Sequence, residues 1–422
     1  MRRDEVEIMA PVGSYESLIA AIQAGAGSVY FGVEQLNMRA RSSNNFTIDD
    51  LKKITEIAHS KGVKTYLTVN VVVFDNELDQ LRRIIDAAKV AGISAIIASD
   101  ISAIMYARQV GVEVHISTQV NITNIEAVRF YSQFADVVVL AREMNIGRVW
   151  EISRQIREEN ITGPSGELVR LEMFVHGALC MAVSGKCYLS LNEMNSSANR
   201  GSCMQSCRRA YIVTDKETGA ELEVDNEYIM SPKDLKTIGF VDELLRSGVR
   251  VFKIEGRARG AEYVKTVVGC YKEAIESVLN GTFTDEKKED WNQRLSKVFN
   301  RGFWNGYYLG QRIGEWSANY GSEATHKKVY VGKCTNFFQK LGVAEFLLEA
   351  QYLEVGDEIL ITGETTGAYE DTVKEMRVKL EPIDKVEKGT YFSMKTNELI
   401  RRNDKLFKIV PTEHATKKAN QL

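Results

Sequence analysis

Between residue 6 and about residue 280, short apolar runs alternate with longer stretches in which apolar residues recur at helical spacing. The short runs lack a polar alternation, which is typical of strands buried on both faces of a parallel sheet. We predict eight such strands, at 6–10, 28–32, 64–70, 95–98, 112–117, 136–141, 171–176 and 251–255. The stretches between them predict helices, among them 15–24, 48–60, 77–91, 103–110, 125–134 and 147–158.

This alternation predicts an α/β fold, specifically a TIM-like (β/α)8 barrel. Eight strand–helix repeats within about 270 residues fit a closed barrel better than an open doubly wound sheet. Neither GxGxxG nor GxxxxGK[ST] occurs, so the usual signals of a dinucleotide or P-loop site are missing. The interval between the seventh and eighth strands is too long for a simple repeat. We place an insertion there, at 177–230, with a strand-like 228–230 at its end and a helix at 232–245.

Near residue 325 the apolar pattern changes to a period of two, with turn signals between the segments. We predict strands at 327–332, 341–348, 357–362, 372–378, 390–394 and 405–410. This pattern predicts a small antiparallel β-barrel domain at 325–422, which follows a catalytic domain at 1–324.

Composition narrows the setting of the protein. The 44% hydrophobic and 26% charged residues are those of an ordinary soluble protein, and no apolar run approaches a membrane span. The charged start is not a secretory signal, so we expect a cytoplasmic protein that does not bind a membrane. The net charge of -3 means that any nucleic acid would have to bind at local basic patches.

Four of the six cysteines fall between residues 180 and 207, directly after the seventh strand. They are Cys180, Cys187, Cys203 and Cys207, in the pattern Cys-x6-Cys-x15-Cys-x3-Cys. Four thiolates from one loop can hold a tetrahedral metal ion or a cubane cluster. The irregular spacing favours a 4Fe–4S cluster over structural zinc, which usually takes two short knuckles, and redox-active thiols are a third interpretation. Cys270 and Cys334 are expected to be core residues.

Polar residues mark the ends of the predicted strands, where a (β/α)8 barrel builds its active site. These candidates are Asn70, Asp100, Gln119, Asn121, Arg142, Glu143, His176, Glu255 and Arg257, with Arg39 and Arg41 in the loop after the second strand. Several arginines at one mouth would suit a ligand with carboxylates or phosphates. The alternative is that such residues cap helices and pair with each other.

Three further observations bear on chemistry. His176 could donate a proton or bind substrate, although a satisfied core histidine is the alternative, and the same holds for His115. No HExxH, GxSxG or Cys-His protease signature is present. Arg200, Arg208 and Arg209 bracket the last two cysteines and would either face an RNA backbone or offset the charge of a thiolate cluster.

The segment around the first two cysteines resembles the signature of the collagenase-like peptidase family numbered thirty-two in the unknown-mechanism class. The matching pattern is Glu172-x-Phe174-x2-Gly177-Ala178-Leu179-Cys180-x4-Gly185-x-Cys187-x-Leu189-Ser190. Five shorter motifs resemble the family too: Ala10-Pro11-Val12-Gly13-Ser14, Val29-Tyr30-Phe31-Gly32, Asn45-Phe46-Thr47, Asn199-Arg200-Gly201-Ser202-Cys203 and Lys253-Ile254-Glu255-Gly256-Arg257. The resemblance extends from residue 6 to about residue 310, and the trailing β-domain is similar to that of longer members.

The resemblance implies an oxygen-independent hydroxylase with a 4Fe–4S cluster on the four cysteines. Its layout is most similar to the prephenate-dependent tRNA proteins that make 5-hydroxyuridine at the wobble position, whereas other relatives hydroxylate a ribosomal cytidine or a ubiquinone precursor. The resemblance therefore implies tRNA and a small dicarboxylate as partners. A homo- or hetero-oligomer is compatible with it. We assign catalysis to His176, Glu255 and Arg257, cosubstrate binding to Arg39, Arg41, Asn70, Gln119 and Arg142, and RNA binding to Arg200, Arg208 and Arg209. A collagenase-like peptidase and a metal-stapled scaffold are the alternatives.

Overall fold

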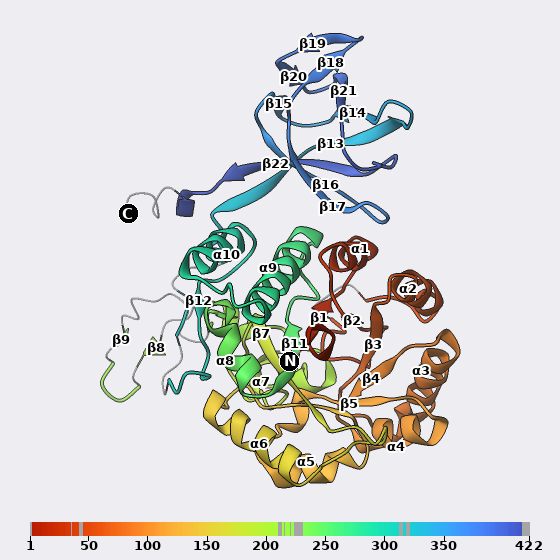
Figure 1. The fold of residues 1–422 in the computed structure, drawn as a ribbon. Coiled ribbons are helices and arrows are strands. Elements are labelled where there is room, and N and C mark those ends of the chain that lie inside the picture. Colours follow the sequence, from red (N-terminus) through yellow and green to blue (C-terminus); the bar gives the residue numbers. More distant parts are fainter. Residues whose placement is uncertain are drawn as a thin grey trace.

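The structure is a computed structural model that describes residues 2–34, 36–41, 45–209, 213–214, 216–219, 221–222, 231–311, 315–317 and 321–415. Figure 1 shows a barrel of strands with helices around it, and a β-rich unit that lies beside helices α1, α9 and α10. No helix in these ranges is long and apolar enough to cross a membrane.

Eight parallel strands form the closed barrel that the sequence predicts. They are β1 (Glu7–Pro11), β2 (Ser28–Phe31), β3 (Lys64–Val69), β4 (Ala95–Ala98), β5 (Val114–Ile116), β6 (Val137–Val139), β7 (Arg170–Gly177) and β11 (Val249–Ile254). Each strand pairs with the next, and β11 closes the barrel because it pairs with both β1 and β7. All eight predicted strands are confirmed, with ends that shift by one or two residues.

The helices between these strands also follow the prediction. They are α1 (Tyr15–Gln23), α2 (Asp50–His59), α3 (Leu78–Ala91), α4 (Ile101–Val110), α5 (Ile125–Ser132), α6 (Ile146–Glu158) and α9 (Ala261–Leu279). Four of them begin at a polar side chain that accepts a backbone N–H of the first turn: Ser14, Asp100, Asn124 and Asn145. Asp100 is therefore a helix cap, as the alternative for strand-end residues predicted.

The prediction of one helix at 232–245 is wrong. The segment forms β10 (Asp234–Lys236), the 3₁₀ turn η6 (Ile238–Phe240) and the shorter helix α8 (Val241–Arg246). β10 pairs antiparallel with the end of β7, so pairing across the fold overrides the local helical pattern. The predicted strand at 228–230 lies outside the described residues.

The remaining elements of the first 325 residues are short, apart from α10. They are η1 (Arg3–Glu5), η2 (Asp75–Glu77), η3 (Thr118–Val120), α7 (Leu189–Met194), η4 (Ala198–Arg200), η5 (Ser206–Arg208), β8 (Val213–Thr214), β9 (Glu221–Leu222), α10 (Asp285–Lys297) and β12 (Phe303–Trp304). Three of them, α7, η4 and η5, lie in the segment that carries the four cysteines.

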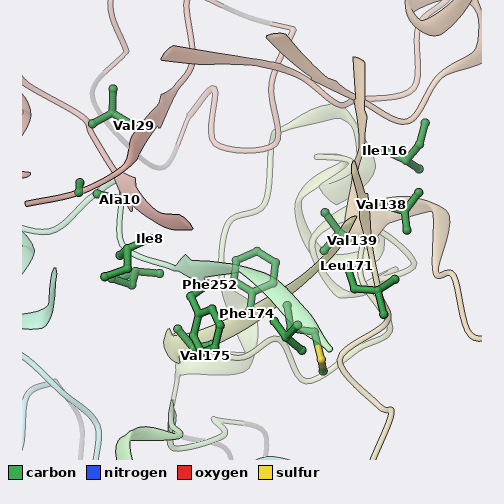
Figure 2. Close-up of a cluster of buried hydrophobic side chains, with 14 of the residues drawn as sticks. Ile8, Ala10, Val29, Ile116, Val138, Val139, Leu171, Phe174, Val175 and Phe252 are labelled. Atoms are coloured by element: carbon green, nitrogen blue, oxygen red, sulfur yellow. The ribbon is translucent and has the colours of Figure 1, made fainter. Parts of the chain in front are cut away.

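The main hydrophobic core fills the space between the barrel strands and the helices around them. Figure 2 shows part of it, in which Ile8 and Ala10 come from β1, Val29 from β2 and Phe252 from β11. Residues at the alternate positions of the same strands face the barrel interior, where Met9, Tyr30, Tyr66, Ile97 and Val251 form a second cluster.

The interior also holds charges. Lys253 donates to Glu172 across the β7–β11 pair at 2.7 Å, and both side chains are almost fully buried.

The C-terminal region is antiparallel, as predicted. Its strands are β13 (His326–Phe338), β14 (Val343–Leu348), β15 (Tyr352–Glu354), β16 (Glu358–Gly363), β17 (Gly367–Thr372), β18 (Met376–Val378), β19 (Glu381–Ile383), β20 (Lys385–Glu387), β21 (Tyr391–Lys395) and β22 (Lys405–Pro411). Eight of them form one sheet in the order β17-β16-β22-β13-β14-β21-β18-β19, and β15 pairs with β20. The sequence analysis missed β17, whose first residues look like a turn, and the short strands β15, β19 and β20.

The two parts of the chain touch through α1 and α9. Gln23 donates to the carbonyl of Thr366 at 3.0 Å, and Lys328 pairs with Glu262 at 2.8 Å. A small apolar cluster joins Ala20 and Ala261 of the helices to Leu360 and Ala368 of the sheet.

Gly177 at the end of β7 allows the closest approach of the backbone to β11. Its φ is +100°, and a Cβ there would lie 2.4 Å from the carbonyl oxygen of Glu255. We expect Gly177→Ala to lower the free energy of unfolding by about 2–4 kcal/mol, because backbone strain and a steric clash add. Gly111→Ala is the matched control, since Gly111 has φ +77° with no heavy atom within 4 Å of such a Cβ. Urea unfolding that gives the same midpoint for both variants would contradict this account.

Candidate functional site at the barrel mouth

A buried carboxylate, Glu255, is the centre of the barrel mouth. It follows β11 and continues the inward-facing positions of Val251 and Lys253. Arg39 donates to one of its oxygens at 2.7 Å, and the hydroxyl of Tyr30 lies 3.2 Å from the other. The Tyr30 hydroxyl is also 2.9 Å from the carbonyl of Ile254, so it fixes both the side chain and the strand end.

Three arginines keep this carboxylate ionised. Burial by itself would raise the pKa of Glu255, but Arg39, Arg142 and Arg257 lower that pKa to about 2. Glu255 in turn raises the pKa of Arg39. At neutral pH the mouth therefore carries one fixed anion among several fixed cations. A carboxylate with this pKa is a poor proton carrier and a good anchor for guanidinium groups.

Arg257 is buried beneath the loop that follows β2. It donates to Thr68 at 3.0 Å and to the Asn37 side-chain oxygen at 3.1 Å, and burial lowers its pKa to about 10, so it stays a cation. The same Asn37 oxygen accepts from the backbone N–H of Arg39 at 3.0 Å. Gly32 makes room for this cation, since a Cβ there would lie 2.5 Å from the guanidinium. Arg257 therefore positions the loop that carries Arg39.

Arg142 is the arginine at the mouth with a free donor. Its guanidinium lies over the ring of Phe174, 4.1 Å from the ring centre, and its Nε is buried without a hydrogen-bond partner. Arg41, by contrast, has an exposed side chain, and its backbone N–H donates to Gly201 in the cysteine segment at 3.3 Å. Of the arginines predicted to bind the cosubstrate, Arg142 is thus the one with a buried N–H group that lacks a hydrogen-bond acceptor.

The four cysteines lie together beside this mouth. Burial raises the pKa of Cys187, and Cys180 and Cys203 raise it further. Burial likewise raises the pKa of Cys207 to about 11, Arg208 lowers it, and the other three thiols raise it. Cys203 also acts electrostatically on Arg39, after Glu255 and burial. The thiols and the Arg39–Glu255 pair therefore belong to one electrostatic neighbourhood.

The four thiols are the side chains that would hold a metal group beside the mouth. Four thiolates around one zinc would lie about 3.8 Å apart, since each Zn–S bond is about 2.3 Å. Among the described residues, no group of three or more His, Cys, Asp or Glu side chains is arranged to hold a metal ion. All four thiols are nevertheless free of disulfides and within electrostatic range of Cys207. Four thiolates are the donor set both of a structural zinc site and of a 4Fe–4S cluster.

Two of the three arginines predicted to bind RNA hold the cysteine segment in place instead. Arg200 forms a fork with Glu77, donates to the carbonyl of Val72 at 3.0 Å and lies over the Phe74 ring. Arg208 donates to Ser231 and to the carbonyls of Pro232 and Leu179 at 2.6–2.9 Å.

Because these guanidinium donors are used inside the fold, Arg200 and Arg208 are structural ties. Arg209 is exposed, and its guanidinium lies 3.9 Å from the sulfur of Met194.

His176 lies apart from the Arg39–Glu255 pair, in an aromatic environment. It is 1% exposed, and the rings of Tyr263, Tyr271 and Phe303 lie 5.6–6.0 Å from it between ring centres. Burial lowers its pKa to about 3, and Lys236 and Arg259 contribute. A histidine that is neutral at every physiological pH cannot deliver a proton as an imidazolium, so the environment favours the core-histidine alternative.

The other predicted residues lie at the mouth with structural partners of different kinds. Asn70 accepts from the backbone of Met38 at 3.3 Å and donates to Ser117 at 3.2 Å, so it ties two strand ends together. Gln119 lies against Gly185 of the cysteine segment.

Sequence reasoning missed Tyr30, Asn37 and Thr68. Tyr30 could have been found because it occupies an inward-facing position of the second strand, but nothing local to Asn37 announces its bond to Arg257.

These features define a TIM-like barrel protein with a cysteine-rich loop beside an arginine-lined mouth. The chain belongs to peptidase family U32, whose profile matches residues 13–318. It is 62% identical over 408 residues to a protein of Porphyromonas gingivalis named collagenase. The aligned region covers 97% of this chain and 99% of that protein.

More distant relatives carry a different name. A tRNA hydroxylation protein P1 of Bacillus subtilis is 31% identical over 87% of this chain and 86% of its own length. The 23S rRNA 5-hydroxycytidine C2501 synthase of Escherichia coli is 32% identical over 74% of this chain and 46% of its own length. The family thus contains relatives named as RNA-hydroxylation proteins as well as relatives named as collagenase.

Glu255→Gln tests the charge balance of the mouth. A pKa held at about 2 instead of the ordinary 4.5 corresponds to roughly 3 kcal/mol of stabilisation by the ionised carboxylate. This stabilisation is complete above about pH 4.5 and is lost as the pH falls toward 2. We therefore expect the variant to be less stable than the parent by about 3 kcal/mol at pH 7, with the difference narrowing between pH 5 and pH 3.

The measurement is urea unfolding across this pH range. Glu143→Gln is the control, because Glu143 is an exposed carboxylate that follows a neighbouring part of the barrel, β6. This variant should keep the parent's pH dependence. A constant difference between Glu255→Gln and the parent from pH 7 to pH 3 would show that Glu255 is not held ionised by the arginines.

Proposed function

We propose that this protein is an oxygen-independent RNA hydroxylase that forms 5-hydroxyuridine in tRNA, with a 4Fe–4S cluster and a dicarboxylate such as prephenate as hydroxyl donor. The observation that carries the proposal is the contact between the thiol segment and the arginine-bearing loop. A Cβ at Gly201 would lie 2.1 Å from the carbonyl oxygen of Asn37, and Cys203 acts electrostatically on Arg39. A cluster on these thiols would therefore border the mouth.

Cys180, Cys187, Cys203 and Cys207 would hold the cluster, which would supply electron transfer at the mouth. The protein around it is built to keep that segment in one place: Arg208 binds the carbonyl of Leu179, next to Cys180, and Arg200 ties the segment to Glu77. Cys180 is exposed, whereas the other three thiols are partly buried. Zinc at the same thiols is the alternative, and metal analysis separates the two.

The arginines at the mouth would have different roles in binding an anionic hydroxyl donor. Arg257 is buried and committed to Thr68 and Asn37, so it positions the loop instead of meeting the ligand. Arg142 would bind a carboxylate through its unpartnered Nε, and Arg39 would share its guanidinium between Glu255 and the ligand. Glu255 keeps the cations fixed in direction and limits the net positive charge of the mouth.

RNA would approach over the exposed rim of the cysteine segment. Arg41, Lys186 and Arg209 are exposed cations there, and Tyr188 is 75% exposed. Cations that meet phosphates and an aromatic ring that stacks on a base are the usual means of binding single-stranded RNA. The relatives named as tRNA hydroxylation proteins support the choice of tRNA over other RNA.

The cluster itself is tested by iron content. Protein purified without oxygen should be brown and hold about four irons per chain, because a cubane cluster has four irons on four thiolates. Cys203→Ala should lose most of the iron and the colour, whereas Cys270→Ala, at a buried thiol inside α9, should keep both. A colourless parent protein with one zinc per chain would refute the cluster.

The reaction is tested by nucleoside mass spectrometry of RNA from a strain without the gene. We expect 5-hydroxyuridine to disappear from tRNA and to return with the parent gene but not with Cys203→Ala. In the purified system, Arg142→Lys should raise the concentration of donor needed for half-maximal rate by roughly tenfold, because a lysine keeps the charge and loses the planar fork. Arg41→Lys, at the exposed rim, is the control and should leave the concentration of hydroxyl donor needed for half-maximal rate unchanged. Unchanged tRNA together with loss of hydroxycytidine from ribosomal RNA would redirect the proposal to rRNA.

A peptidase is the second candidate, favoured by the relatives named collagenase. One serine–histidine pair within hydrogen-bonding distance is Ser94 and His59, whose side chains lie 3.3 Å apart. Ser94 precedes β4, so the pair lies at the opposite end of the barrel from the mouth, and its hydroxyl also accepts the backbone N–H of Thr65. We expect pure protein to release no peptides from gelatin above background. Release that survives repurification and is abolished by Ser94→Ala would favour the peptidase.

A further inference from the structure

Buried polar atoms without a partner gather on one side of the barrel mouth. In the part of the chain that the structure describes, four buried side-chain atoms at this place have no hydrogen-bond partner, and they belong to Thr118, Gln119, Asn121 and Arg142. The first three follow β5 and the fourth follows β6, the neighbouring strand. Each unmet buried group costs about 1–3 kcal/mol, so such a concentration in one place calls for a ligand that meets them.

Asn121 presents a fixed acceptor. Its side-chain NH2 donates to the carbonyl of Gln119 at 3.2 Å, which determines the orientation of the amide and leaves the buried Oδ1 without a donor. The backbone of Asn121 is left-handed, with φ 58°, a conformation that asparagine tolerates better than most residues. The residue is therefore held in one place by backbone and side chain together.

Gln119 extends the same edge toward the cysteines. Its Oε1 is buried without a partner and would lie 2.2 Å from a Cβ at Gly185, two residues before Cys187. A ligand that meets both amide oxygens would therefore lie between the end of β5 and the thiol segment.

The chemistry of these atoms selects the ligand. Ionised carboxylates offer only acceptors, so a dicarboxylate cannot satisfy the oxygens of Asn121 and Gln119. A pyrimidine base offers N–H donors on its Watson–Crick edge in a planar ring, and amide side chains commonly read such edges.

Resting on the proposed function, we propose that Asn121 forms a base-reading subsite, with Gln119 at its edge, in which the Asn121 Oδ1 accepts the N3–H of a uridine turned out of its stack. The arginines remain for the anionic donor. This revises the sequence-based assignment of Gln119 to the cosubstrate.

The test compares two short single-stranded RNAs that differ by one methyl group. One has uridine at its centre and the other has 3-methyluridine, which lacks the N3–H. Binding to the anaerobic, iron-loaded protein is measured by fluorescence anisotropy. The parent protein should bind the uridine RNA more tightly on the order of tenfold, because the methylated base leaves the buried acceptors unmet.

Two variants decide whether Asn121 is responsible. Asn121→Gly removes the acceptor and fits the left-handed backbone, so it should bind both RNAs within about twofold of each other. Asn121→Asp keeps an acceptor and should retain the preference for uridine. Equal binding of the two RNAs by the parent protein, or an undiminished preference in Asn121→Gly, would overturn the subsite. A preference that depends on Asn121 in a protein that forms no hydroxylated uridine would uphold the subsite and refute the proposed reaction.

Discussion

The parallel pairing of β7 with β11 is the constraint on which the site depends. It closes the barrel, and it places the segment that leaves β7, with its four cysteines, beside the residues that follow β11, Glu255 and Arg257. The backbone N–H of Glu255 donates to the carbonyl of His176 at 2.9 Å, and Gly177 permits the approach because it has no Cβ. A bulkier residue there would push apart the two halves of the site, thiols on one side and charges on the other.

Inside the closed barrel, charged side chains form ion pairs with each other, so few of them are available to bind a ligand. Lys253 and Glu172 neutralise each other deep in the interior, and Arg39 and Glu255 do so at the mouth. Buried ion pairs contribute little net stability when their desolvation is counted, but removal of one partner is costly. Their effect here is to fix directions: once Arg257 is committed to Asn37 and Arg39 to Glu255, the unmet needs of the mouth are confined to Arg142 and the amides after β5.

How far the sequence could predict this arrangement depends on the range of each interaction. The barrel strands were predictable because a strand buried on both faces must be apolar throughout, and that signal is local. β10 was not, since its residues form a strand by pairing with β7. The bonds of Arg200 to Glu77 and of Arg208 to Ser231 were not predictable either, because these partners lie far away in the sequence. The cysteines were predictable as a set, whereas the contact of Gly201 with Asn37 follows from the packing of two distant loops.

Relatives that are named for proteolysis and relatives that are named for RNA hydroxylation share this fold, so the name alone does not decide between them. The site does weigh on the choice. Nucleophilic hydrolysis needs an activated nucleophile, whereas the mouth has an ionised carboxylate held among guanidinium groups, with four free thiols beside it. Guanidinium groups suit the binding of a small anion, as in the proposed function. The buried amide oxygens after β5 would meet a neutral group that donates hydrogen bonds, which the anionic cosubstrate does not supply.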